Sequence, residues 1–127
     1  MATIEYTLFA ADYMVTHYGG SFTLSNDILY FKNNIDEFYC DLKNKTENNK
    51  LLFWHRYEGQ EEYHIQIRRK NVVAGLYQCF THINKYSGIK YDRQERIRIQ
   101  RLVSENWQKL KKEEKYLWLA KSQTKTL

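Results

Sequence analysis

The chain has 127 residues and a formal net charge of +5, and 43% of its residues are hydrophobic and 16% aromatic. This composition excludes a disordered tail, because a chain of this length and apolar content can bury one good core or two small ones. No apolar run approaches the length of a membrane helix, and the first fifteen residues lack the basic start and apolar block of a signal peptide. We therefore expect a protein that acts inside the cell without a membrane partner.

The charge is divided unevenly along the chain. Residues 1–67 contain five Lys or Arg and ten Asp or Glu, a net charge of −5, whereas residues 68–127 contain fifteen and five, a net charge of +10. A strongly basic segment of this size is what a phosphate-binding module requires. The sequence therefore predicts an acidic, aromatic region over 1–67 that packs or binds a partner, followed by a basic helical region over 68–127.

Two helices are predicted in the first third of the chain. The first ends at the glycine pair 19–20, which suits a helix C-terminus. Its apolar residues recur at helical intervals and are Ile4, Leu8, Ala11, Val15 and Tyr18. The second helix is predicted over about 26–44, because Ser25-Asn26-Asp27 offers N-cap chemistry. Its apolar residues are Ile28, Phe31, Ile35, Phe38, Tyr39 and Leu42. The polar segment 44–50 is predicted to be a loop.

The segment 51–69 is predicted to form a β-hairpin. After the turn-forming residues 58–61, Tyr63, Ile65 and Ile67 alternate with polar residues, which is the period-two pattern of a half-buried strand. This hairpin can bring His55 and His64 face to face. Two histidines without a third ligand or a placed carboxylate are more often ordinary strand residues, so we predict no metal site.

Helices are predicted again in the basic region. One spans about 71–85, and its apolar residues are Val72, Val73, Leu76, Tyr77, Phe80 and Ile83. The apolar stripe of the next helix is Ile99, Leu102, Val103, Trp107 and Leu110. The pair Glu113 and Glu114 then marks the first turn of a further helix, where carboxylates suit the positive end of the helix dipole.

Residues 99–118 resemble the HMG box, a small L-shaped DNA-binding domain of three helices. The second and third helices of that family run Ile, eight residues to Trp, three to Leu, then Glu-Glu-Lys and an aromatic residue three past the Lys. This chain has the same pattern without a gap at Ile99, Trp107, Leu110, Glu113, Glu114, Lys115 and Trp118. The resemblance is divergent, covers about residues 69–120, and is nearest to fungal mating-type HMG proteins.

The patterns and the resemblance together predict the fold class. We expect a mainly α protein with a short β-hairpin (α+β). In this arrangement a C-terminal three-helix HMG-like unit is preceded by a helical N-terminal half and a two-stranded hairpin.

Two basic runs flank the helix predicted at 71–85 and are the candidate DNA contacts. The residues are Arg68, Arg69 and Lys70, followed by Asn71, and then Arg93, Arg96, Arg98 and Arg101. The planar arginine side chain can hold a phosphate with two hydrogen bonds or enter a narrow minor groove. If only one basic run were present, we would interpret it as a solvated helix face in which Asp92 pairs with Arg96. Two runs in a segment of net charge +10 favour nucleic acid.

The resemblance also implies a wedge residue that enters between base pairs. Counting back from Ile99 without a gap places Tyr77 at the wedge, whereas a one-residue deletion places Gln78 there. We prefer Tyr77 as the DNA contact, because an aromatic wedge can unstack a base step. The alternative is that Tyr77 and Phe80 are both core residues.

The usual sequence signs of an enzyme or a cofactor site do not occur. The sequence contains no Gly-rich phosphate loop, no His-Glu helical pair and no Cys-His metal spacing, and no nucleophile can be paired with a base. We therefore expect no catalytic residues and no cofactor. Cys40 and Cys79 are isolated thiols and are expected to be buried small hydrophobic residues.

The function expected from these observations is a DNA-binding regulator of transcription in the nucleus. It would bind duplex DNA through the minor groove and could bind a protein partner through residues 1–67. The alternative is a non-enzymatic interaction module or inhibitor, for example a viral or mobile-element protein, that acts on a nucleic-acid-binding partner in the host nucleus or cytoplasm. A third possibility is RNA binding through stacked aromatic and arginine side chains.

Overall fold

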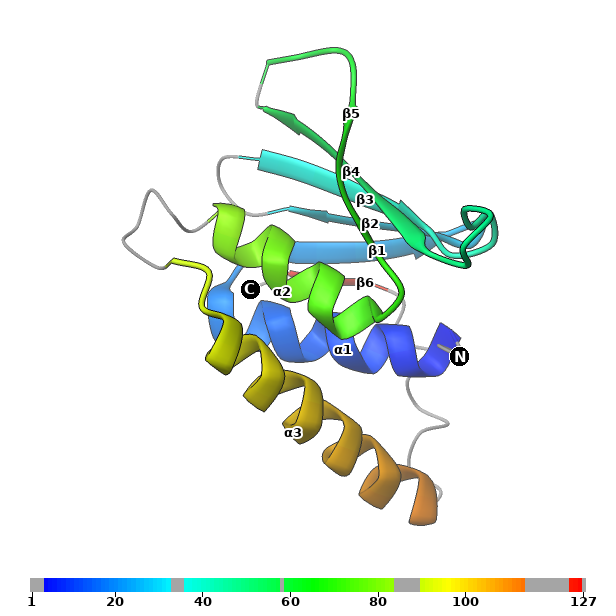
Figure 1. Ribbon diagram of the computed structural model, residues 1–127, viewed down its shortest axis with the longest axis vertical. Coiled ribbons are helices and arrows are strands. Elements are labelled where there is room, and N and C mark those ends of the chain that lie inside the picture. The colour runs from blue at the N-terminus through cyan, green and yellow to red at the C-terminus, as the bar shows by residue number, and fades with distance from the viewer. Residues whose placement is uncertain (1–3, 33–35, 58, 84–89, 114–123, 127) are drawn as a thin grey trace.

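The computed structural model describes residues 4–32, 36–57, 59–83, 90–113 and 124–126. It shows an antiparallel sheet with strand order β5-β4-β3-β2-β1-β6, and three helices on one side of that sheet (Figure 1). The elements in chain order are α1 (Ile4–Tyr18), β1 (Ser21–Ser25), β2 (Ile28–Lys32), β3 (Asp36–Asp41), β4 (Leu51–Tyr57), β5 (His64–Arg69), α2 (Val72–Ile83), α3 (Arg93–Lys112) and β6 (Thr124–Thr126).

The prediction of a mainly α fold with a two-stranded hairpin is wrong, because the segment predicted as a helix over 26–44 forms two strands. Asn26 and Asp27 have φ angles of 51° and 64°, the left-handed conformation that a tight hairpin turn between β1 and β2 requires. These residues therefore start a hairpin instead of capping a helix. Their sequence fits both uses, since Asn and Asp favour N-caps and left-handed turn positions alike.

Several local predictions are confirmed. Helix α1 ends at Tyr18 before the glycine pair, and α2 and α3 occupy the segments predicted to be helical. The hairpin predicted over 51–69 forms from β4 and β5, with His55 opposite His64. The helix predicted after Glu113 lies outside the described residues.

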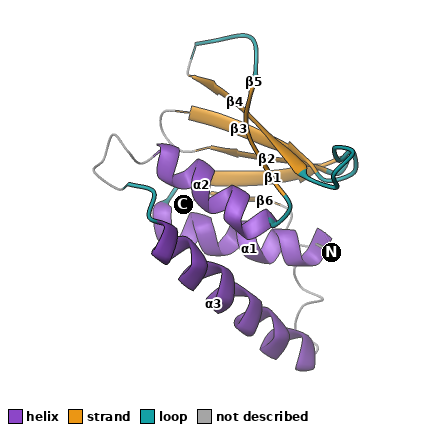
Figure 2. Cartoon of the chain, in the orientation of Figure 1, coloured by secondary structure: helices purple, strands orange, loops and turns teal. Residues whose placement is uncertain are grey.

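Alternating side chains on the strands build the core. Each of the first four strands presents every second residue to the helices, and the buried apolar ones are Phe22, Leu24, Leu29, Phe31, Phe38, Cys40, Leu51 and Phe53. Helix α1 contacts β1, and α2 contacts β4 and β5 (Figure 2). Gly75 on α2 allows the closest approach, because a Cβ atom at this position would overlap the ring of Phe53.

Helix α3 forms the outermost layer and packs on both α1 and α2 (Figure 1). Its buried residues Ile99, Val103 and Trp107 follow at intervals of four, and the Trp107 ring contacts Tyr6 and Phe9 of α1 at centroid distances of 5.7 and 5.5 Å. Helix α2, the first helix of the predicted three-helix unit, shares one core with α1 and the sheet instead of belonging to a separate helical unit. The third helix of that unit lies outside the described residues.

None of the described helices is long and apolar enough to span a membrane.

Candidate nucleic-acid interface

The outer face of α3 carries a row of cations. Because Ile99, Val103 and Trp107 face the protein, positions on the opposite side of the helix face solvent. Four exposed basic residues at spacings of 3, 8 and 3 lie there and form what we call the α3 stripe, namely Arg98, Arg101, Lys109 and Lys112. At a rise of 1.5 Å per residue, the stripe is about 21 Å long.

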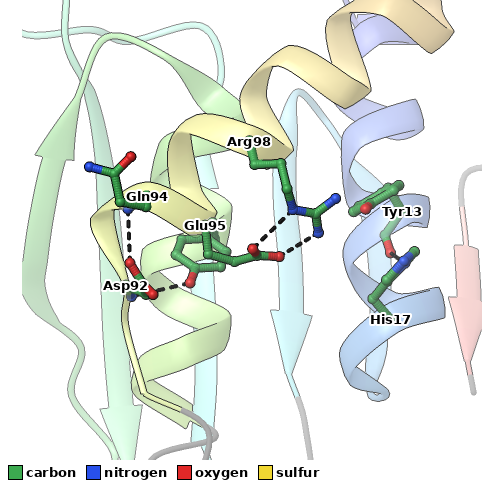
Figure 3. A network of polar contacts seen from close by, with 7 residues as sticks. Tyr13, His17, Asp92, Gln94, Glu95 and Arg98 are labelled. Carbon is green, nitrogen blue, oxygen red and sulfur yellow. Dashed lines mark hydrogen bonds and ion pairs between the residues drawn. The ribbon is translucent and has the colours of Figure 1, made fainter.

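The N-terminal end of α3 is held in place by polar contacts. The Asp92 side chain accepts a hydrogen bond from the backbone N–H of Gln94 at 2.9 Å and caps the helix. The backbone N–H of Asp92 donates to the Tyr77 hydroxyl of α2 at 3.2 Å (Figure 3). These contacts fix the direction in which the helix leaves the core.

Arg98 is already engaged within the protein. Its Nε donates to a Glu95 carboxylate oxygen at 2.9 Å, and the two side chains form an ion pair beside Tyr13 of α1 (Figure 3). The hydrogen bond from Arg98 lowers the pKa of Glu95, so this carboxylate stays ionised. Arg101, Lys109 and Lys112 make no ion pair with a described residue. They are therefore the cations of the stripe that can bind an external anion.

Of the residues predicted from sequence, Arg93 and Arg101 on α3 and Arg68 and Lys70 before α2 are exposed. Arg96 is half-buried and its Nε is enclosed by protein. The four exposed residues are available to bind nucleic acid. Arg96 is not available, because it lies on the side of α3 that faces the protein core.

Two other predicted contacts, Arg69 and Asn71, have structural roles. Arg69 donates to the Gln78 side chain at 3.1 and 2.9 Å and to the Tyr91 hydroxyl at 3.4 Å, which links the end of β5 to the segment before α3. The Asn71 side chain accepts from the backbone N–H of Ala74 at 3.0 Å and caps α2. Their side chains hold elements together, so they are poor candidates for direct DNA contact.

Tyr77 does not have the position that a wedge requires. Its side chain is 1% exposed and belongs to the core, and its ring lies 6.3 Å from that of Tyr18. Inserting it between base pairs would remove a large aromatic residue from the core. The structure therefore supports the alternative in which Tyr77 and Phe80 are core aromatics.

Sequence reasoning missed Lys109 and Lys112 as site residues. A usable signal was present, because each follows an arginine of the stripe by eleven residues, which is close to three full helical turns. These two lysines extend the stripe from one turn of α3, at Arg98 and Arg101, to its C-terminal end.

A second exposed surface lies on the face of the sheet away from the helices. Tyr39 stacks on Trp54 at a centroid distance of 5.7 Å and contacts Tyr30 at 5.9 Å and Tyr63 at 4.7 Å. The Arg56 guanidinium lies 4.6 Å from the centre of the Tyr63 ring. We call Tyr30, Tyr39, Trp54 and Tyr63 the aromatic face. Among the described helices, none packs against it (Figure 2).

No family model, no curated protein and no solved structure matches the chain. The resemblance to the HMG box therefore stays a prediction, and the function has to be inferred from the chemistry of these surfaces.

Residues that can hold a metal ion lie elsewhere, between the sheet and α2. Asp36, His55 and His82 bring ligand atoms within 4.8 Å of one another. The sequence indicated only the pairing of His55 with His64. Strand pairing adds the carboxylate, and the packing of α2 adds the third ligand.

Proposed function

We propose that this protein binds duplex DNA through the α3 stripe. The observation that carries the proposal is the row of exposed cations on α3, three of which have no ion pair with a described residue. Helix α3 has seven basic and two acidic residues. A rigid row of this kind can neutralise several phosphates and release their counterions, which is the main source of sequence-independent DNA affinity.

The expected mode of binding is contact with the phosphate backbone. Because Tyr77 is buried and Asn71 caps α2, the residues that remain for DNA are basic side chains without a base-reading partner. Lysine and arginine contacts to phosphates position a protein on a duplex but carry little sequence information. The proposed function is thus a DNA-binding regulatory protein whose affinity depends strongly on salt.

A salt titration of binding tests this proposal. Fluorescence anisotropy with a labelled duplex gives the slope of log K against log salt, to which each phosphate contact contributes about −0.9. We expect the Arg101→Ala/Lys112→Ala variant to bind more weakly and to lose up to about 1.8 from the slope magnitude.

The matched control is Lys32→Ala/Lys43→Ala, which removes the same charge from exposed positions in the sheet region. This control should bind DNA nearly as well as the wild type. Equal weakening in both variants would show that net charge, and not the α3 stripe, determines binding. Unchanged binding in the α3 variant would reject the proposal.

The aromatic face supports a second candidate function, that of a protein-binding surface. All four of its residues lie within 1–67, and Tyr30 is 42% exposed. Tyrosine and tryptophan are enriched at protein interfaces, because they combine a large apolar area with a polar tip. Such a surface would allow the chain to hold a partner while α3 contacts DNA.

Affinity capture with three baits tests this second function. A genuine partner should be retained by the wild type and by Arg101→Ala/Lys112→Ala, and lost with Tyr30→Ser/Trp54→Ser. Reconstitution with the purified partner should give the same order of affinities. If the partner is retained equally by all three baits, the aromatic face is not its binding site.

A further inference from the structure

Four titratable side chains meet at one end of the interface between the sheet and α2. Asp36 is the first residue of β3, His55 lies near the end of β4, His64 begins β5, and His82 is the second-last residue of α2. His55 Nε2 is 3.2 Å from Asp36 Oδ2, and the His55 and His82 rings are 5.0 Å apart. Residues distant in sequence thus bring three imidazoles and one carboxylate together.

The buried carboxylate of Asp36 has no adequate partner among the described residues. Asp36 and His55 are both 0% exposed, and neither oxygen of Asp36 accepts a hydrogen bond from a described residue. The contact with His55 Nε2 has the distance of an ion pair but not the geometry of a hydrogen bond. A buried carboxyl group whose oxygens accept no hydrogen bond is unfavourable unless another partner, such as a metal ion, satisfies them.

No described Lys or Arg side chain forms an ion pair with Asp36. An imidazole nitrogen is the commonest metal ligand in proteins. The arrangement therefore presents a carboxylate and imidazole nitrogens to the same point, with ligand atoms within 4.8 Å of one another.

The surrounding residues hold the His55 ring in one orientation. His55 Nδ1 and His64 Nε2 are 3.2 Å apart and share a hydrogen bond. Phe38 stacks on the His55 ring at a centroid distance of 4.6 Å, and Tyr57 contacts it edge-on at 4.6 Å. A second hydrogen bond on the far nitrogen is the usual support for a metal-binding histidine, since it fixes the tautomer.

We propose that Asp36, His55 and His82 bind one divalent transition-metal ion, with Zn²⁺ as the expected occupant and His64 as a positioning residue. Two nitrogens and one carboxylate oxygen suit Zn²⁺, whereas Ca²⁺ and Mg²⁺ prefer oxygen ligands alone. Two ligand atoms about 2.0–2.1 Å from a tetrahedral ion are about 3.3–3.4 Å apart, close to the observed contact between His55 and Asp36. His82 is half-buried, and three protein ligands leave the fourth position to water.

The ion would join the two layers of the fold. Asp36 and His55 belong to adjacent strands, and His82 belongs to the helix that covers them. Since metal binding favours the folded chain, Zn²⁺ should raise its stability. The site contains no residue of α3, so it is independent of the proposed DNA binding.

Zinc titration of the full chain after chelator treatment and dialysis tests the proposal. Competition with a chromophoric zinc chelator gives the affinity, elemental analysis gives the stoichiometry, and thermal unfolding gives the stabilisation. We expect one Zn²⁺ per chain and a higher unfolding temperature with the ion. Asp36→Asn and His82→Gln should each weaken binding by more than about 100-fold, and His64→Gln by roughly 10–100-fold.

His17→Gln is the matched control, because His17 is an exposed histidine on α1 outside the cluster. This variant should bind Zn²⁺ as the wild type does. Circular dichroism without metal shows whether each variant folds. If Asp36→Asn does not fold, the Co²⁺ absorption spectrum of the wild type should still show tetrahedral coordination that His82→Gln abolishes. Absence of stoichiometric binding to the wild type, or equal binding in all variants, overturns the proposal.

Discussion

The two cysteines show how burial controls chemistry at the scale of one residue. Cys40 on β3 and Cys79 on α2 are both 0% exposed, as expected from their isolated positions in the sequence. Burial raises the pKa of Cys40 to about 12 and that of Cys79 well above its usual value. Because the thiolate is the reactive form, neither side chain is a nucleophile near neutral pH.

We predict that both thiols are inert to a thiol-specific reagent at pH 8 in the folded protein and that both react in guanidinium chloride. The pKa values fall to about 8.5 on unfolding, so the thiolate fraction and the accessibility increase together. Absorbance of the released chromophore gives the number of reactive thiols in each condition. Rapid reaction of one thiol in the native protein would contradict the burial of that residue.

The turn between β1 and β2 determines an entire element, because it decides whether the following segment is a strand or a helix. Asp27 has a φ of 64°, and a left-handed conformation strains a residue with a Cβ atom by roughly 1–2 kcal/mol. Glycine removes this strain but loses about 0.5–1 kcal/mol of conformational entropy.

We therefore predict that Asp27→Gly stabilises the protein by about 0.5–1 kcal/mol, the difference between these two effects. Urea unfolding measures the change, and Asp27→Ala serves as the control that keeps the strain and loses the polar side chain. A helix N-cap at this position would give a different result, since glycine would then bring no gain over aspartate.

Helix α3 carries a negative residue within its basic row. Glu105 is exposed and lies on the outer face between Arg101 and Lys109. We predict that Glu105→Gln strengthens DNA binding at low salt by roughly fivefold, since one charge interaction at short range in water is about 1 kcal/mol.

The gain from Glu105→Gln should disappear at high salt, where such interactions are screened. Anisotropy at two salt concentrations measures it. Glu47→Gln, which removes an exposed charge from the loop between β3 and β4, is the control. An equal gain in both variants would indicate an effect of net charge alone.

At the scale of the whole molecule, residues from both ends of the sequence share one core. Leu8 of α1, Phe31 of β2, Phe80 of α2 and Val103 of α3 all belong to the same buried cluster. The inner face of β4 is covered by α2, so residues 1–67 by themselves would expose apolar side chains such as Phe53.

We predict that a fragment of residues 1–67 does not fold alone and that the full chain unfolds in one transition. Circular dichroism should show little strand content in the fragment, while tryptophan fluorescence and circular dichroism should give coincident melting curves for the full chain. A cooperative transition in the fragment would indicate that the acidic region is an independent domain.

Local sequence patterns predicted the elements whose conformation depends mainly on their own residues. Helix α1 was predictable from its apolar spacing and the glycine pair, and the β4–β5 hairpin from strict alternation. The strands β2 and β3 were not, because their apolar residues fit a helical period as well as an alternating one. Only pairing with β1 and β4 resolves this ambiguity, since an isolated strand has no hydrogen-bond partner.

The sequence by itself determined the charge division, the basic row of α3 and the approach of His55 to His64 across a hairpin, all of which depend on neighbouring residues or on composition. Tertiary structure decided the rest. It buried Tyr77, gave Asn71 and Arg69 structural roles, and placed Asp36 and His82 beside His55. The physical reason is that contacts between distant segments depend on strand register and helix packing, which the whole core sets and no local pattern contains.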